Sequence, residues 1–487
     1  MTIFVAVDIG ASSGRLIKTG SHPTGQLVLE EIHRFKNGFS KVGQHDYWAI
    51  DHLVQDILVG LQKLKQDGVT DCILGIDTWA VDYCLMDKVG QLLQQPIAYR
   101  DERTSQAVAA FKEKMPLETL YGKTGIQIQP FNTLFQLFVE DRALLDQADK
   151  LLLIPDYLGY VLTGQQVMEK TNASTMQLLN VATQTWDKDL LAILGISEEL
   201  LPPLVDAGNV LGELQSERFP EFDLPKVTVV NVASHDTASA VLGTPAVTNE
   251  EWAYISSGTW SLLGIETKAF DVSQTAFQEN YTNEWGAHNT IRFLKNIMGM
   301  WLIQEVARGE NYQHSYPEMA ALAAEVPAFQ RFIDVNADKL LNPDDMSNAI
   351  QVACLENGQT APETTGELAR TIYDNLALYY AVELEKLGQL ASIKDKIKTL
   401  HIVGGGANND FLNQLTADVT GLEVIAGPSE ATAVGNIIMQ QIAVGQLASI
   451  QAGRQLIAES FDFKHYQPSS DYQEVVQTYK NWLGENK

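Results

Sequence analysis

The sequence predicts an α/β protein built as two lobes, and three observations carry that prediction. Short apolar runs end abruptly in polar or glycine-rich turns, which is typical of buried strands in a central sheet. Segments with apolar residues at helical spacing lie between those runs, so strands and helices alternate along the chain. A strand that opens into a turn of small residues occurs early in each half.

Strands are expected at five apolar runs, which are residues 3–7, 72–76, 227–232, 253–255 and 400–403. Each run is short, mostly aliphatic, and bounded by turn signals, as a buried strand is. The polar and small residues that follow these runs include the candidate functional residues.

Helices are expected where apolar residues recur every three or four positions. Phe411, Leu415 and Val419 have this spacing, with Asn408 or Asn409 as the N-cap and Gly421 just past the end. Two further stripes contain Ile372, Leu376, Tyr379 and Tyr380, and Tyr472, Val475, Val476, Tyr479 and Leu483. We interpret the stripes as faces that pack on a core.

Residues 243–251 form the clearest internal break, so we expect an N-terminal lobe of residues 1–245, a C-terminal lobe of residues 246–487, and a cleft between them.

The 487 residues are 45% hydrophobic, enough for more than one core. Lys and Arg number 34 against 61 Asp and Glu, a net charge of −27. This acidity argues against general binding of nucleic acid or of an anionic membrane.

Targeting and metal signals are weak. The apolar N-terminus is too short for a signal peptide, and no apolar stretch reaches the length of a membrane span, so we expect a cytoplasmic protein. The three cysteines match no metal motif, and Cys72 lies in an apolar run as a core residue would.

The first candidate motif is the turn after the first run, Asp8-Ile9-Gly10-Ala11-Ser12-Ser13-Gly14-Arg15. We expect Gly10 and Gly14 to permit unusual backbone angles and the N–H groups to point at phosphate oxygens. Ser12, Ser13 and Arg15 add donors, and Asp8 could hold Mg²⁺ directly or through water. A tight β-hairpin with no ligand is the alternative.

Two further small-residue turns lie in the second half. Residues 256–261 (SSGTWS) resemble the first turn, and two such turns could clasp a polyphosphate; a plain hairpin is again the alternative. Residues 404–409 (GGGANN) follow a strand and precede a helix, without the full fingerprint of a dinucleotide site. A helix N-terminus packing on a nucleotide and a simple helix start both remain open.

The fourth motif is Ser234-His235-Asp236-Thr237 at the end of an apolar run. Asp236 could accept a proton from a substrate hydroxyl, and His235 could bond a sugar oxygen. An N-cap aspartate, or an aspartate satisfied by nearby backbone N–H groups, is equally open. Neighbouring residues in an extended chain point to opposite sides, so Ser234, His235 and Asp236 are not expected to form a hydrolase relay.

Together these segments resemble the FGGY carbohydrate kinases, and the resemblance covers essentially the whole chain. It is carried by residues 7–15 (VDIGASSGR), 33–39 (HRFKNGF), 75–82 (GIDTWAVD), 99–104 (YRDERT), 234–240 (SHDTASA), 256–261 (SSGTWS), 293–299 (FLKNIMG) and 402–406 (IVGGG). The phosphate turns and triple glycine are shared widely across the superfamily. The Asp-Thr-Trp, His-Asp-Thr and Phe-Leu-Lys-Asn segments narrow the match to the branch that phosphorylates L-rhamnulose at its 1-hydroxyl.

The resemblance implies two actin-like, ribonuclease-H-like domains that bind ATP and a sugar, with Mg²⁺, in a monomer or homodimer. The expected nucleotide contacts are Ala11, Ser12, Ser13, Gly14, Arg15, Thr259, Gln304 and Gly405. The expected sugar contacts are Ala80, His235, Thr237 and Asn296, with Asp236 as general base and Asp8 as the metal residue. Ala80 departs from the glycine that the family pattern leads us to expect there.

Other functions stay open at this stage. The nearest is a kinase for another ketose such as L-fuculose. An actin-like ATPase switch would hydrolyse ATP without any sugar. A catalytically idle sugar-sensing module is disfavoured by Asp236, and a dehydrogenase by the incomplete glycine fingerprint.

Overall fold

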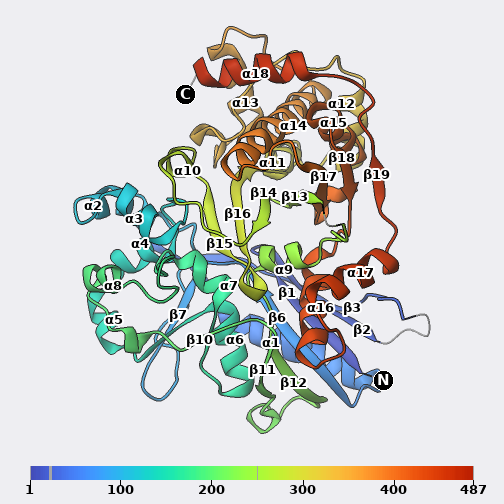
Figure 1. Ribbon diagram of the computed structural model, residues 1–487. Coiled ribbons are helices and arrows are strands. Elements are labelled where there is room, and N and C mark those ends of the chain that lie inside the picture. The colour runs from blue at the N-terminus through green and yellow to red at the C-terminus, as the bar shows by residue number, and fades with distance from the viewer. Residues whose placement is uncertain (1, 21–24, 249, 486–487) are drawn as a thin grey trace. The chain divides into compact units, whose positions relative to one another are not determined.

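A computed structural model describes residues 2–20, 25–248 and 250–485 (Figure 1). The chain divides into two compact units, and both are discontinuous in sequence. Unit 1 contains Met1–Val247, Glu266–Phe293 and Ala431–Phe461. Unit 2 contains Thr248–Ile265, Leu294–Glu430 and Asp462–Lys487. Asn249, inside the predicted break, lies outside the described residues.

Unit 1 combines one large sheet with many short helices. Its strands are β1 (Ile3–Ile9), β2 (Ser13–Gly20), β3 (Glu30–Lys36), β4 (Phe39–Val42), β5 (His45–Trp48), β6 (Asp71–Thr78), β7 (Tyr83–Met86), β8 (Lys150–Leu153), β9 (Met168–Glu169), β10 (Leu204–Val205), β11 (Asn209–Glu213), β12 (Lys226–Asn231) and β15 (Thr282–Trp285). Its helices are α1 (Ile50–Gln66), α2 (Ala107–Lys112), α3 (Leu117–Thr124), α4 (Thr133–Phe138), α5 (Arg142–Gln147), α6 (Ile154–Thr163), α7 (Lys170–Ala173), α8 (Lys188–Leu194), α9 (Asp236–Leu242), α10 (Gln274–Gln278), α16 (Ala431–Ala443) and α17 (Ile450–Ser460).

The large sheet of unit 1 has the strand order β11-β12-β6-β1-β2-β3. Its three central strands, β12, β6 and β1, run parallel, and β2, β3 and β11 pair antiparallel at the sides. Asp8 lies opposite Asp77 in the β1–β6 register, and Thr78 forms a parallel bridge with His235. The carboxyl ends of the three central strands therefore meet at one edge, the usual position for a ligand site in an open α/β sheet.

Helices cover both faces of this sheet because its central strands carry buried residues on both sides. Val5 and Val7 belong to a core cluster that includes residues of α1 and α6. On the other face, Gly75 gives α16 room, since a Cβ there would lie 2.4 Å from Asn436 Oδ1. Figure 1 shows α16, from the red end of the chain, beside the blue strands β1 and β6.

Unit 2 is built on a second sheet, of order β15-β16-β14-β13-β17-β18-β19. The unit boundary runs through β14 and β16, and β15 is counted in unit 1. The strands of unit 2 are β13 (Glu251–Ser257), β14 (Trp260–Thr267), β16 (Ile291–Met298), β17 (Ile397–Val403), β18 (Glu423–Ala426) and β19 (Lys464–Tyr466). Its helices are α11 (Trp301–Gly309), α12 (Tyr316–Ala324), α13 (Met346–Glu356), α14 (Thr365–Leu390), α15 (Asp410–Thr420) and α18 (Gln473–Glu485).

The predicted elements are confirmed. All five apolar runs are strands: β1, β6, β12, β13 and β17. The helix predicted around Phe411 is α15, with Asn409 as its N-cap and Gly421, at φ 69°, just past its end. The two apolar stripes lie on α14 and α18, and α18 belongs to unit 2, where the Tyr479 hydroxyl donates to Ile333 O at 2.8 Å.

The structure also bears on Cys72 and on membrane-spanning segments. Cys72 is a core residue, 4% exposed, as predicted. In the part of the chain that the structure describes, we find no helix whose length and apolar character would let it cross a membrane.

Candidate active site

The small-residue turn after β1 is the tip of a β-hairpin. Ile9 pairs with Gly14 across the hairpin, and the Gly10 N–H donates to Ser13 O at 2.9 Å. Neither glycine has a positive φ, so the expectation that they supply unusual backbone angles is wrong. Gly14 is needed for space instead, because a Cβ there would lie 2.1 Å from Phe35 Cζ. Ala11, Ser12 and Ser13 form the tip, where Ser12 is exposed.

Asp8 and Arg15 face each other across the same hairpin. The guanidinium donates from Nε at 3.1 Å and from Nη2 at 2.8 Å to Asp8 Oδ2. The two residues predicted to hold a metal and a phosphate are therefore joined in a salt bridge, with Asp8 only 8% exposed. A ligand at this turn would meet a positive group held in a fixed position.

Three carboxyl groups gather at the ends of β1, β6 and β12. Asp77 is fully buried between Asp8 and Asp236, and burial, reinforced by the charge of Asp8, raises its pKa well above the ordinary value. The Asn436 amide of α16 donates to Asp77 Oδ2 at 2.5 Å. Among the described residues Asp77 Oδ1 has no hydrogen-bond partner, although it is buried. A buried acceptor without a donor is costly and is often found where a ligand or ion completes the site.

Asp236 begins α9 and is one-third exposed. Its Oδ1 accepts hydrogen bonds from the Thr237 backbone N–H at 2.5 Å and from the Thr237 hydroxyl at 3.1 Å. The predicted alternative, an aspartate satisfied by a nearby N–H, therefore describes one of its two oxygens. No described residue donates to Oδ2, which leaves that oxygen as an acceptor for a substrate proton.

His235 is held by a buried ion pair that the sequence does not suggest. Arg292, fully buried on β16, lies 3.0 Å from Glu284 Oε2 and 3.2 Å from His235 Nδ1. The other imidazole nitrogen, Nε2, is 3.4 Å from Asp236 Oδ1. Burial acts to raise the pKa of Glu284, but the charge of Arg292 and the contacts with His235 and Arg292 together outweigh it, and the pKa is lowered. The ion pair thus fixes the ring beside Asp236.

The expectation that Ser234, His235 and Asp236 do not form a relay is confirmed. The Ser234 hydroxyl donates to Glu169 Oε2 at 3.0 Å, and its backbone N–H donates to the same oxygen at 3.1 Å. Ser234 therefore anchors the end of β12 to the interior and does not contact His235 through its hydroxyl.

Ala80 lies in a strained turn after β6. The next residue, Val81, has φ 69°, which is rare for a β-branched side chain and costs of order 1–3 kcal/mol. Buried Asp82 holds the turn by accepting from the indole N–H groups of Trp48 at 2.6 Å and Trp79 at 3.0 Å. Burial raises the pKa of Asp82 to about 6. Strain of this kind is concentrated at functional sites, which agrees with a sugar contact at Ala80.

In unit 2, the second small-residue turn is also a hairpin, between β13 and β14. Its tip supports the start of α11: Gly258 O accepts from Met300 N at 3.1 Å, and Thr259 O accepts from Trp301 N at 3.1 Å. Gln304 lies one turn further along α11. The structure therefore brings Thr259 and Gln304, both predicted nucleotide contacts, into one local assembly.

The triple glycine packs on that same hairpin. A Cβ on Gly406 would lie 2.0 Å from Ser257 Oγ, and Gly404 has φ 82° with Ser257 O close by. Gly405 differs, because it is exposed and a Cβ there would meet nothing within 4 Å. Two of the glycines are thus needed for packing, and the third presents bare backbone to open space.

The remaining predicted residues divide between the units. Thr237 contacts Asp236 in unit 1 as described above. Asn296 lies on the part of β16 that belongs to unit 2, where its carbonyl accepts from Asn336 Nδ2 at 3.3 Å. Each unit therefore assembles its own share of the predicted site.

Four residues of this site had no role in the sequence-based interpretation: Asp77, Asp82, Glu284 and Arg292. For Asp77 and Arg292 the signal is a charged residue inside an otherwise apolar strand, as in Ile291-Arg292-Phe293, whereas the sequence around Asp82 and Glu284 carries no such signal. A buried charge is costly unless it is paired, so each such residue indicates an ion pair or a dense hydrogen-bond set.

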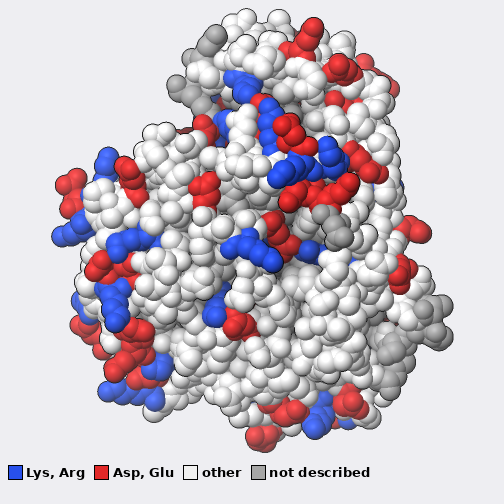
Figure 2. Space-filling view, in the orientation of Figure 1, with Lys and Arg blue, Asp and Glu red and all other residues white. Residues whose placement is uncertain are grey.

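The charged side chains on one face of the molecule are mixed in sign (Figure 2). On the face in Figure 2, Lys and Arg occur in small groups interspersed with Asp and Glu. An anionic ligand therefore depends on local groups such as the Arg15 guanidinium.

Comparison with known proteins identifies the family. Residues 3–243 match the N-terminal domain of the FGGY family of carbohydrate kinases, and residues 253–444 match its C-terminal domain. A protein named rhamnulokinase from Enterococcus faecalis is 61% identical over 95% of this chain and 94% of its own length. Proteins of the same name from Ligilactobacillus salivarius, covering 100% of both chains, and Bacillus subtilis, covering 98% of both, are each 50% identical.

Solved structures support the fold. A xylulose kinase from Lactobacillus acidophilus aligns with a TM-score of 0.79 at 16% identity, covering 99% of this chain and 96% of its own. Plasmodium falciparum glycerol kinase with ADP gives the same TM-score at 16% identity, over 100% of this chain and 97% of its own. The predicted two-domain α/β fold is confirmed, and the chain belongs to the FGGY family of carbohydrate kinases.

Proposed function

We propose that the protein transfers the γ-phosphoryl group of ATP to the 1-hydroxyl of L-rhamnulose, giving L-rhamnulose 1-phosphate and ADP in L-rhamnose catabolism. The observation that carries this proposal is the 50–61% identity, over 95% or more of the chain, to proteins named rhamnulokinase. The solved neighbours with other sugar names are only 16% identical, so they bear on the fold and not on the substrate.

Asp236 is our candidate general base. Its Oδ2 would accept the hydroxyl proton as the sugar oxygen attacks the γ-phosphorus, the new P–O bond forms and the bond to ADP breaks. The hydrogen bonds from Thr237 to Oδ1 orient the carboxylate for this. General-base assistance is typically worth about 10²–10⁴-fold, or roughly 3–5 kcal/mol.

Each unit carries some of the residues that we assign to the nucleotide. In unit 2, Thr259 lies at the hairpin tip, Gln304 lies on α11, which begins at that tip, and the bare backbone of Gly405 allows close approach. In unit 1, residues 11–15 would supply hairpin N–H groups, two hydroxyls and the Arg15 guanidinium. Phosphoryl transfer depends mainly on such positioning and charge stabilisation.

Mg²⁺ would contact Asp8, directly or through water. Mg²⁺ takes oxygen ligands, usually one or two carboxylates together with water and substrate phosphates. The clustered carboxyl groups of Asp8 and Asp77, with the unsatisfied buried Oδ1 of Asp77, fit that donor set. When bound, the ion would neutralise charge on the phosphates.

The sugar contacts we assign are Ala80, His235, Thr237 and Asn296. Glu284 and Arg292 hold the His235 ring, and Asp82 holds the turn that carries Ala80. A site fixed in this way discriminates between sugars through hydroxyl positions, because a misplaced hydroxyl leaves a buried polar group unpaired.

The test is ADP release with purified protein, ATP and Mg²⁺ across L-rhamnulose, L-fuculose, L-ribulose and D-xylulose, with a no-sugar control. We expect a strong preference for L-rhamnulose. A preference for L-fuculose would reassign the substrate, and equal ADP release without sugar would make the protein an ATPase switch.

The role of Asp236 is tested with Asp236→Asn, which should lower kcat by about 10²–10⁴-fold while ATP still binds. Asp223→Asn, which changes an exposed carboxyl group in the same unit, is the matched control and should keep normal turnover. Near-normal kcat in Asp236→Asn would remove Asp236 from this role.

We further propose that the enzyme acts in the cytoplasm as a monomer or homodimer. Sedimentation analysis distinguishes the monomer from the homodimer.

A further inference from the structure

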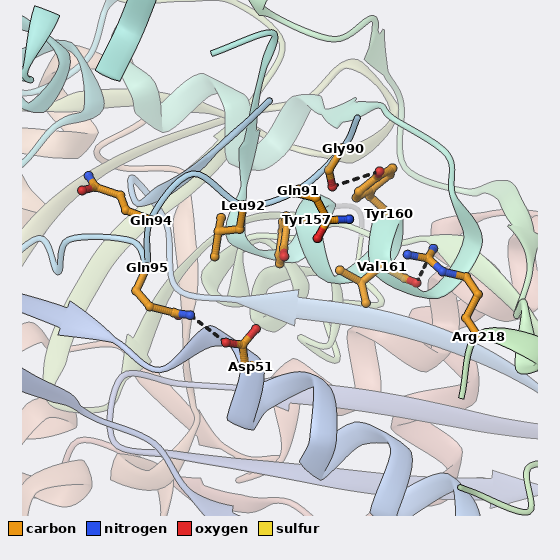
Figure 3. Close-up of a pocket in the computed structure, with 10 residues that line it drawn as sticks. All are labelled: Asp51, Gly90, Gln91, Leu92, Gln94, Gln95, Tyr157, Tyr160, Val161 and Arg218. Carbon is orange, nitrogen blue, oxygen red and sulfur yellow. Dashed lines mark hydrogen bonds between the residues drawn. The ribbon is translucent and has the colours of Figure 1, made fainter. Parts of the chain in front are cut away.

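A pocket of about 360 Å³ opens in unit 1 among residues that play no part in the proposed reaction (Figure 3). It is lined by the start of α1, the loop of residues 90–95, one side of α6 and the one-turn helix Ser216–Arg218. Figure 3 shows the side chains of Asp51, Gln91, Tyr157 and Arg218 around it. Its volume is at the small end of the range for ligand sites, which suits a molecule of one ring.

The walls of this pocket are held in place by the protein's own hydrogen bonds. Gln95 joins two elements, since its Nε2 donates to Asp51 Oδ2 at 2.7 Å and its Oε1 accepts from Ile50 N at 2.9 Å. The Tyr160 hydroxyl donates to Gly90 O at 3.3 Å, and a Cβ at Gly90 would lie 2.0 Å from that hydroxyl. Walls fixed before binding reduce the ordering cost that a ligand must overcome.

Tyr157 is the observation that points to a ligand. Tyr157 lines the pocket with a side chain that is 7% exposed, and its hydroxyl makes no hydrogen bond to a described residue. Burial raises the pKa of this phenol, so it stays protonated and able to donate. The hydroxyl can therefore donate to an acceptor on a ligand that occupies the pocket.

The lining chemistry selects the class of ligand. Asp51 and Arg218 contribute one charge of each sign, which disfavours both a phosphate and a cation. Glutamine amides and a phenol offer donors and acceptors to neighbouring hydroxyls, and the faces of Tyr157 and Tyr160 offer apolar surface to C–H groups. We propose that this pocket binds a neutral monosaccharide, at a site separate from the one where the substrate sugar is phosphorylated.

The pocket also has a structural path to the sugar contacts we assign above. Gln95 lines it, and four residues later the Tyr99 N–H donates to Asp82 Oδ2 at 3.1 Å. Trp48, whose indole N–H also donates to Asp82, donates its backbone N–H to Pro96 O at 2.9 Å. These hydrogen bonds link the pocket wall at Gln95 to the turn that carries Ala80.

The test is binding of L-rhamnose, L-fucose, D-glucose and D-mannose to the full chain without ATP, measured by titration calorimetry and by saturation-transfer NMR. We expect at least one of these sugars to bind, and Tyr157→Phe to weaken that binding about 3–10-fold by removing one hydrogen bond. Gln91→Ala and Arg218→Met should weaken it as well. Tyr312→Phe, at an exposed tyrosine of unit 2, is the matched control and should leave it unchanged.

The variants also keep the experiment decisive. Tyr157→Phe leaves no internal partner unsatisfied, so its melting temperature should match the wild type. If it does not, exposed Gln91→Ala and Arg218→Met carry the test. The proposal is overturned if no sugar binds, if binding is the same in all three pocket variants, or if inorganic phosphate displaces the sugar. None of these results bears on the turnover assay with L-rhamnulose, so the proposed function stands or falls separately.

Discussion

Replacing Gly435 by alanine should damage the protein, although alanine is the better helix former. Gly435 lies inside α16, where local propensity alone favours alanine by about 1 kcal/mol. A Cβ at this position, however, would lie 1.8 Å from Ser239 O and 2.8 Å from Gly243 N, both backbone atoms of the α9 segment. Contact between carbon and a carbonyl oxygen needs about 3.3 Å, so α9 would have to move by about 1.5 Å.

Two consequences follow because backbone cannot rotate away as a side chain can. Overpacking of this kind costs roughly 1–3 kcal/mol, which exceeds the gain in propensity and reverses its sign. The displaced helix also begins with Asp236, and a misplacement of about 1 Å at reacting groups can cost about 10²-fold in rate. We therefore expect lower stability together with a large loss of kcat.

The measurements are urea unfolding and ADP release with saturating ATP and L-rhamnulose. Gly122→Ala is the matched control, because Gly122 is also helical in unit 1 and a Cβ there meets nothing within 4 Å. That control should gain up to about 1 kcal/mol and keep its kcat. Unchanged stability and unchanged kcat in Gly435→Ala would refute the reasoning.

Three other outcomes are expected. Arg292→Met leaves the buried Glu284 carboxylate without its partner, so it should lower the unfolding free energy by about 3–5 kcal/mol in urea titration. The double variant Arg292→Met/Glu284→Gln should recover part of that loss. Equal stability of the single and double variants would contradict the ion-pair assignment. The folded-state pKa of Asp82 is raised to about 6 from a reference value of 3.8, so its contribution to stability is complete below pH 4 and is lost as the pH rises through 6. The wild type should thus lose up to about 3 kcal/mol relative to Asp82→Asn between pH 4 and 7, and a flat difference in unfolding free energy would contradict this. Gly406→Ala should destabilise unit 2, because the new Cβ would lie 2.0 Å from Ser257 Oγ. Gly405→Ala should leave the melting temperature unchanged and raise the KM for ATP. The reverse pattern would remove Gly405 from the nucleotide site.

Local patterns predicted the strands and the positions where they end. Runs such as residues 72–76 are buried on both faces, so their apolar composition is visible without knowledge of their neighbours. Asp8 near the end of β1 and Asp236 shortly after β12 are visible in the same way, because each is a charged residue at the end of such a run. The hairpin nature of both small-residue turns was also among the stated alternatives.

Non-local pairing was beyond the reach of these patterns. Arg292 meets His235 from 57 residues away, and Asn436 meets Asp77 from 359 residues away, so no window along the chain contains both partners. Val81 shows a second limit, because a β-branched residue with positive φ contradicts every local preference. The hydrogen bonds that converge on Asp82, together with the bond from the Thr133 hydroxyl to Val81 O at 2.6 Å, hold that conformation.

The return of residues 431–461 to unit 1 has a consequence for synthesis on the ribosome. Nearest the core sheet, α16 supplies the Gln440 amide that donates to Val5 O at 2.9 Å. At about 5–20 residues per second, roughly 180 residues after Val247 must be translated before α16 emerges, which takes about 10–40 s. During that interval the sheet lacks one of its covering helices, and the face that α16 later covers is exposed. Unit 1 is completed only after residues 431–461 have been synthesised. Slowing translation between Val247 and Ala431 should therefore increase aggregation.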